Sequence, residues 1–95
     1  MTFQEYLLVI LIEECDETSQ RATKAIRFGM EEIQKDQELN NAQRIIGKFN
    51  DLYAVMELLK ENDLIDVIID RELIVAKKEK IMKYYEYSKS LKIFD

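Results

Sequence analysis

The stretch Phe3–Phe28, FQEYLLVILIEECDETSQRATKAIRF, decides the fold of this 95-residue chain. Gly29 follows it directly, after a last turn that carries Arg27, and this arrangement is typical of a helix C-terminus. The apolar and small residues of the stretch recur at spacings of three and four, which places them on one face of a helix. They are Leu7, Leu8, Leu11, Cys15, Ala22, Ala25 and Ile26. The pattern predicts one long helix over 3–28.

A polar loop and a second helix are expected next. Residues 30–40 lack a clean helical period, and this loop has room for one helical turn at Glu31–Gln34. Asn40 or Asn41 is a suitable N-cap for the helix that follows. That helix is predicted over 42–61, with an apolar stripe formed by Ile45, Phe49, Leu52, Met56 and Leu59.

The last third of the chain predicts another long helix after a connector. Asp70 is a suitable N-cap for a helix that carries Glu72 in its first turn and ends near Ser90. The apolar stretch 64–69 before it fits a short helix or an extended connector equally well. We therefore predict a single all-α domain over 1–95, an antiparallel helical bundle of about four helices.

The composition excludes many kinds of site and partner. With no histidine, one cysteine, no proline and two glycines, the chain lacks the residues for His-based triads, Cys₄ metal sites or Gly-rich phosphate loops. A net charge of −5 argues against direct nucleic-acid binding. The apolar run 6–12 is too short to span a bilayer and lacks the basic start of a signal peptide. Because the lone Cys15 also suits a reducing compartment, we expect a cytoplasmic protein without a membrane partner.

A stripe of charged residues lies beside the apolar face of the first helix. Glu14 and Glu17 are three apart and therefore share one face, which continues through Arg21 and Lys24. Carboxylates at the margin of a core are partly desolvated, and a hard divalent cation would compensate them. The plain structural alternative is a solvated ion pair between Glu17 and Arg21 at i,i+4.

A further carboxylate is expected from the facing helix. Asp51 lies in the middle of the second helix among core-type residues, where aspartate has poor helix propensity and calls for a reason. It is the candidate that would complete a metal site with Glu14 and Glu17. Its structural alternative is an ion pair with Arg44 or Lys48.

Three motifs follow one another along the chain. They are Glu13-Glu14-x-x-Glu17 with Gln20 after it, then Lys24-Ala25-x-Arg27-Phe28-Gly29, then Phe49-Asn50-Asp51-Leu52-x-Ala54-Val55-Met56-Glu57-Leu58-Leu59. Together they resemble the MazG-like all-α nucleoside triphosphate pyrophosphohydrolase superfamily, in particular its short, single-domain forms of the kind carried by phages. The family signature is E-E-x-x-E, a gap, then E-x-x-D, and the likeness covers about residues 3–90.

The resemblance implies an activity, a cofactor and a site. Family members are helical bundles that form dimers or tetramers, and they hydrolyse a nucleoside triphosphate to a monophosphate and pyrophosphate. Four carboxylates hold Mg²⁺ there, with Mn²⁺ as an expected substitute. On this chain the implied metal ligands are Glu14, Glu17 and Asp51, and Glu13 beside them completes the catalytic set. The residues expected to bind the nucleotide are Lys24, Arg21, Arg27, Lys48, Lys77, Lys80 and Tyr84.

Position 48 departs from the family pattern. The E-x-x-D motif would place a glutamate three residues before Asp51, and this chain has Lys48 there. The exchange changes the formal charge of the four-position site from −4 to −2. One charge at 4 Å and an effective dielectric constant near 20 is worth roughly 4 kcal/mol before screening. Three outcomes are open: three carboxylates still hold an ion, Lys48 contacts a phosphate directly, or nucleotide binds and turns over poorly.

Three functions therefore compete. The first is a Mg²⁺-dependent nucleotide pyrophosphohydrolase of a bacterial or phage-infected cell, weakened by Lys48. The second is a nucleotide-binding or regulatory relative without efficient turnover. The third is a helical interaction module whose acidic stripe is a solvated face, in which the C-terminal lysines cover a helix end and the tyrosines pack.

Overall fold

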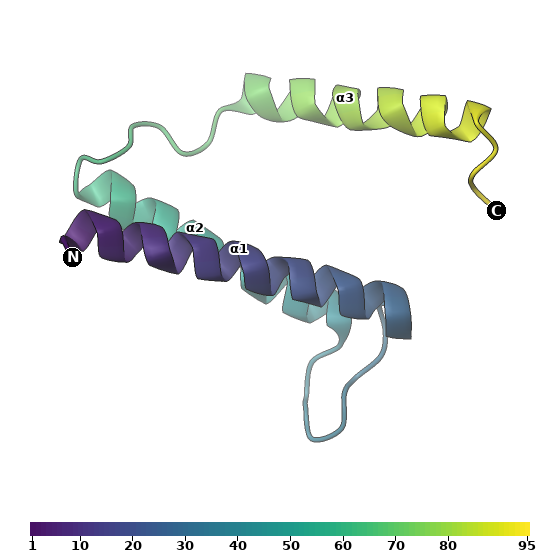
Figure 1. The fold of residues 1–95 in the computed structure, drawn as a ribbon, viewed down its shortest axis with the longest axis horizontal. Helices are drawn as coiled ribbons and strands as arrows, with labels where there is room; N and C mark the ends of the chain where they lie inside the picture. Colours follow the sequence, from purple (N-terminus) through teal and green to yellow (C-terminus); the bar gives the residue numbers. More distant parts are fainter.

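The computed structural model describes residues 1–95 and contains three helices and no sheet (Figure 1). Helix α1 spans Phe3–Phe28, α2 spans Asn41–Glu61 and α3 spans Arg71–Ser90. A single antiparallel bridge pairs Ile33 with Asn40. The all-α prediction is confirmed, whereas the number of helices is three rather than about four. None of the three combines the length and apolar character that a membrane span requires.

Side chains at the N-termini explain where the helices begin. Thr2 and Asn40 each form a reciprocal capping box with the residue three positions on. Asp70 accepts a hydrogen bond from the backbone N–H of Leu73. Of the two N-caps considered for α2, Asn40 is the one used, and Asn41 is the first helical residue.

The two segments that offered a further helix are not helical. The turn considered at Glu31–Gln34 is irregular, and residues 64–69 form a connector. The loop 29–40 is tied to α2 by Asn41, whose fully buried amide donates hydrogen bonds to the Gly29 carbonyl and the Glu32 carboxylate. Six residues are too few to sustain a helix nucleus by themselves, so the connector is irregular, and its Ile65 packs against the core of the α1–α2 hairpin.

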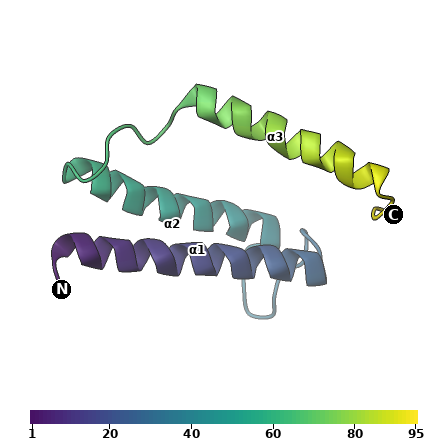
Figure 2. The same cartoon turned by 45° about the horizontal axis from the view of Figure 1, so that its top comes forward.

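Helices α1 and α2 form an antiparallel hairpin, and α3 stands apart from both (Figures 1 and 2). The only packing between helices is that of α1 on α2. The Cα radius of gyration is 16.8 Å, against about 13 Å for a compact chain of this size. A single chain therefore supplies a two-helix hairpin, and the predicted bundle is incomplete within it.

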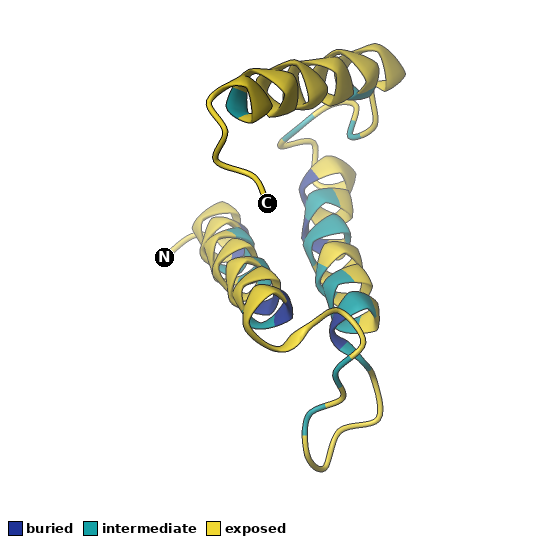
Figure 3. Cartoon of the chain, turned by 90° about the vertical axis from the view of Figure 1, so that its right-hand side faces the viewer, coloured by how far each residue is buried: buried dark blue, intermediate teal, exposed yellow.

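The less exposed side chains lie where α1 and α2 face one another (Figure 3), and we call them the α1–α2 seam. The seam changes from apolar to polar along its length. It repeats at alternating spacings of four and three, as in coiled-coil packing. The apolar part lies near the N-terminus, where Leu7, Val55 and Leu59 are buried. The seam consists of Leu7, Leu11, Glu14, Thr18, Arg21 and Ala25 on α1 and Asn41, Ile45, Lys48, Leu52, Val55 and Leu59 on α2.

Large apolar side chains elsewhere remain exposed. Of the stripes expected from the sequence, Leu8, Ile26 and Phe49 lie outside the seam and face solvent. Helix α3 has no buried residue. Its exposed apolar and aromatic side chains include Leu73, Ile81, Met82, Tyr84 and Tyr87. A surface of this kind is typical of a chain that packs against a partner.

The two glycines provide a matched stability test. Gly29 ends α1 with φ +96° and ψ 152°, a region that only glycine adopts without strain, so Gly29→Ala should cost about 1–3 kcal/mol of unfolding free energy. Gly47 is helical and exposed, with open space around a built Cβ, so Gly47→Ala should add about 0.5–1 kcal/mol. Urea unfolding at equilibrium measures both. Equal effects from the two substitutions would contradict the assignment of Gly29 as the C-cap.

Candidate functional site

Four charged side chains meet in the middle of the α1–α2 seam, and we call them the Lys48 cluster: Glu14, Glu17, Lys48 and Asp51. The Lys48 Nζ atom lies 2.6 Å from Glu17 Oε2, 3.3 Å from Asp51 Oδ2 and 3.7 Å from Glu14 Oε2. Helix spacing explains the meeting, because each helix contributes two residues three positions apart and the antiparallel pairing sets them at one level. The three carboxylates proposed as metal ligands are thus brought together around one ammonium.

The ammonium is held strongly in its charged form. The hydrogen bond to Glu17 raises the pKa of Lys48 above its ordinary value. Burial opposes this rise, whereas the hydrogen bond to Asp51 and the charges of Glu14 and Glu17 add to it. A raised pKa means that this contribution to folding is fully present below the ordinary pKa and is lost as the pH rises through the folded-state value. At neutral pH Lys48 is therefore a cation at the centre of the cluster.

The donor set suits a hard divalent cation. Glu14 Oε2 is buried and accepts no hydrogen bond, so it has lone pairs free for a cation. Oxygen donors are those that Mg²⁺ prefers, at about 2.0–2.1 Å. As the side chains stand, however, no group of three acidic residues is spaced to hold an ion. The carboxylates are spaced around the Lys48 ammonium, which would have to leave before an ion could bind.

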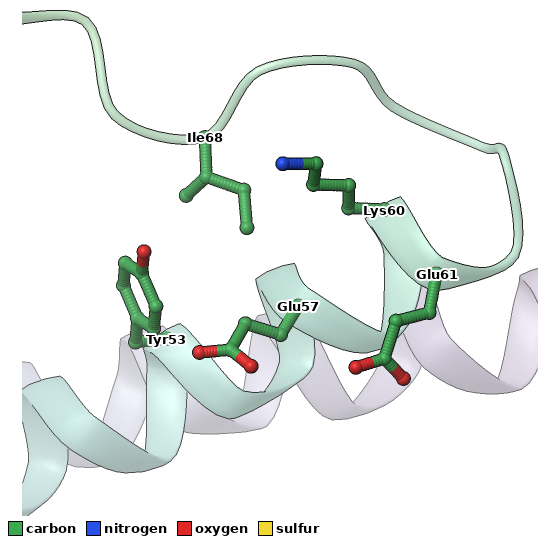
Figure 4. Close-up of a pocket in the computed structure, with 5 residues that line it drawn as sticks. All are labelled: Tyr53, Glu57, Lys60, Glu61 and Ile68. Carbon is green, nitrogen blue, oxygen red and sulfur yellow. The ribbon is translucent and has the colours of Figure 1, made fainter.

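Lys48 lies at the centre of the cluster, with its ammonium among the three carboxylates. No cavity opens at the cluster. A cavity of about 350 Å³ lies instead between α2 and the connector (Figure 4). It is lined by Tyr53, Glu57, Lys60, Glu61 and Ile68.

Two arginines lie one turn from the Lys48 cluster, toward the loop. Arg21 is only 6% exposed, and its NH1 donates to Gln34 Oε1 at 3.4 Å. Arg44 donates to the same oxygen. Neither guanidinium has a carboxylate within ion-pair distance, because Glu17 and Asp51 both pair with Lys48. The alternative ion pairs Glu17–Arg21 and Asp51–Arg44 are therefore wrong, whereas the alternative Asp51–Lys48 is formed.

Sequence reasoning missed two members of this arrangement. Arg44 lies four residues before Lys48, so it shares the face of α2 that contributes to the seam, and this spacing was a signal available in the sequence. Gln34 lies in an irregular loop, where no periodicity indicates which way a side chain points.

The other candidate residues are spread over the molecule. Glu13 is exposed and Lys24 is half-buried, and neither forms an ion pair. The Arg27 guanidinium lies 4.9 Å from the centroid of the Phe28 ring. The three candidates on α3, which does not pack on the hairpin, are therefore not brought to the cluster within one chain: Lys77, Lys80 and Tyr84.

Comparison with family models, with curated proteins and with solved structures gives no significant match to this chain. The likeness to MazG-like pyrophosphohydrolases therefore stays a prediction that rests on the three motifs.

Proposed function

We propose that this protein hydrolyses a nucleoside triphosphate to the monophosphate and pyrophosphate, with Mg²⁺ or Mn²⁺ as cofactor. The observation that supports the proposal is the meeting of Glu14, Glu17 and Asp51, from two helices, around the Lys48 ammonium. These are the residues that the motif resemblance assigns to the metal. In the alternative of a helical interaction module with a solvated acidic face, the three carboxylates would be dispersed over the surface.

Each residue has a distinct part in the proposed reaction. Glu14, Glu17 and Asp51 hold the ion, which when bound neutralises phosphate charge and polarises phosphorus. Lys48 would have to leave the centre of the carboxylates for the ion to bind, and its flexible stem allows the ammonium to move. Glu13, exposed on the same helix, is a candidate to orient the attacking water. Lys24, half-buried on α1, neutralises the phosphate chain, and Arg27 is a weaker candidate for that role.

The direct test is a measurement of pyrophosphate release. Purified protein is incubated with each common ribo- and deoxyribonucleoside triphosphate in Mg²⁺, in Mn²⁺ and in EDTA. Release of pyrophosphate with one or more nucleotides, dependent on the metal, is the expected result. Release of orthophosphate alone, or no turnover with any nucleotide, would refute the proposed reaction.

A second candidate function is favoured by the central position of Lys48. An ammonium that occupies the cation position competes with a metal ion for the same carboxylates, as expected for a nucleotide-binding relative that turns its ligand over poorly or not at all. Equilibrium binding of nucleotides without pyrophosphate release distinguishes this candidate from the first.

The proposed site also requires a second copy of the chain if α3 is to contribute. We expect a homo-oligomer, a dimer or a tetramer, because α3 leaves apolar side chains uncovered and the hairpin alone has a thin core. Light scattering at micromolar concentration should give a mass of at least twice 11.3 kDa. The double variant Leu73→Lys/Ile81→Lys should reduce that mass. A monomeric parent chain would contradict the expectation.

A further inference from the structure

We infer that Arg21 and Arg44 form a binding site for a phosphate group, and that the Gln34 amide oxygen occupies the place of the anion in the ligand-free chain. The inference deepens the proposed function and rests on it for the identity of the ligand as the phosphate chain of a nucleotide. The first observation is the burial of Arg21, which is 6% exposed and has no carboxylate partner. A buried charge is costly unless an opposite charge compensates it.

The second observation is that two guanidinium groups share one neutral acceptor. Both Arg21 and Arg44 donate through NH1 to Gln34 Oε1, so two like charges converge on a single oxygen. An amide oxygen carries only a partial negative charge. A phosphate group offers several charged oxygens and accepts paired hydrogen bonds from guanidinium groups, which is the geometry that arginine favours.

The third observation is an opposite imbalance one turn away. In the Lys48 cluster three carboxylates share one ammonium, whereas here two guanidinium groups share no anion. Arg21 follows Glu17 by four residues and Arg44 precedes Lys48 by four, a separation of about 6 Å along each helix. In a complex of a divalent cation with a polyphosphate, the cation would compensate the carboxylates of the Lys48 cluster, and the phosphate oxygens would compensate the two guanidinium groups.

Gln34 can give way to a ligand. It is half-buried, and the five loop residues after it are exposed. No other side-chain hydrogen bond holds its amide. A change of its side-chain rotamer would free both guanidinium groups without disturbing α1 or α2.

The test uses tripolyphosphate as the probe, in EDTA, with thermal unfolding and calorimetric titration as readouts. Saturating tripolyphosphate should raise the Tm of the parent chain by about 4 °C or more, and sodium chloride of equal ionic strength should not. ATP in EDTA is tested in parallel, to show whether a nucleotide binds at the same place. The parent, Arg44→Gln, Gln34→Glu and Lys35→Gln chains are compared.

Each variant has its own expected result. Arg44→Gln should lose most of the response to tripolyphosphate. Gln34→Glu should raise the ligand-free Tm, because its carboxylate pairs with both arginines, and should abolish the response by filling the site. Lys35→Gln, an exposed change in the same loop, should keep the response of the parent.

Some results would overturn the inference. They are an unresponsive parent chain, a full response in Arg44→Gln or Gln34→Glu, or an equal loss in Lys35→Gln. Because the titrations contain no metal, they are independent of turnover. Tripolyphosphate binding without pyrophosphate release would therefore refute the proposed reaction alone. Pyrophosphate release by a parent chain whose Tm does not respond to tripolyphosphate would refute the phosphate site alone.

Discussion

Lys48→Glu is expected to strengthen Mg²⁺ binding at the Lys48 cluster by at least about tenfold, since changes to groups that merely support metal ligands already alter affinity by about 10–100-fold. The substitution removes the competing ammonium and adds a fourth carboxylate. The charge of the four residues changes from −2 to −4. Pyrophosphate release at subsaturating Mg²⁺ should rise with the affinity, because more of the protein then carries the ion.

The same substitution should make the hairpin depend on metal. In EDTA, four carboxylates with no cation between them repel one another across the α1–α2 seam, and the Tm should fall well below that of the parent. Mg²⁺ should restore it. Calorimetric titration and thermal unfolding measure the two effects, and Lys60→Glu provides the matched control, with the same charge change on the same helix outside the cluster.

Two outcomes would contradict this account of Lys48. If Lys48→Glu abolishes an activity that the parent has, the lysine acts on the phosphates and does not stand in for a lost ligand. If Lys60→Glu tightens Mg²⁺ binding equally, the effect comes from overall charge and the cluster has no special part in it.

Glu14→Gln and Asp51→Asn should each lower kcat/KM for pyrophosphate release by about 100-fold or more, because each removes one of only three expected metal ligands. Glu14→Gln should be at least as damaging. Its Oε2 is the buried oxygen without a hydrogen bond, and an amide nitrogen in its place would point a donor at the cation position.

The circular dichroism spectrum separates the loss of activity from a loss of folded structure. Both changes keep the shape of the side chain, so the circular dichroism spectrum should stay that of the parent. Asp16→Asn, an exposed change on α1, should leave kcat/KM unchanged. Full activity in Asp51→Asn would refute the metal-site interpretation of this sequence.

The helix boundaries were largely predictable because they depend on local signals. The bounds of α1 follow from the periodicity and from Gly29, and the start of α3 follows from Asp70. The number of helices was not predictable in the same way, because the mostly apolar stretch 64–69 is compatible with either conformation until tertiary contacts decide. The detachment of α3 depends on which surfaces pack together, and an amphipathic pattern does not specify the partner.

The candidate site was predictable only up to the pairing of the helices. The motif spacing identified Glu14, Glu17 and Asp51, and the structure brings these three together. Whether Glu17 pairs with Arg21 on its own helix or with Lys48 across the seam depends on the register between α1 and α2. A one-dimensional pattern does not contain that register, and for the same reason the meeting of Arg21 with Arg44 was not foreseen.

The change from apolar to polar along the α1–α2 seam has a consequence for how the two helices align. A repeat of four and three is nearly unchanged by a slide of seven residues, and the loop 29–40 is long enough to allow one. Sliding in one direction would bury the Lys48 ammonium beside Leu7, and in the other it would set that ammonium against Arg21. Both misalignments place a charge where it is unfavourable. The charged middle of the seam thus selects a single alignment of the hairpin, much as an isolated polar residue does in a coiled coil.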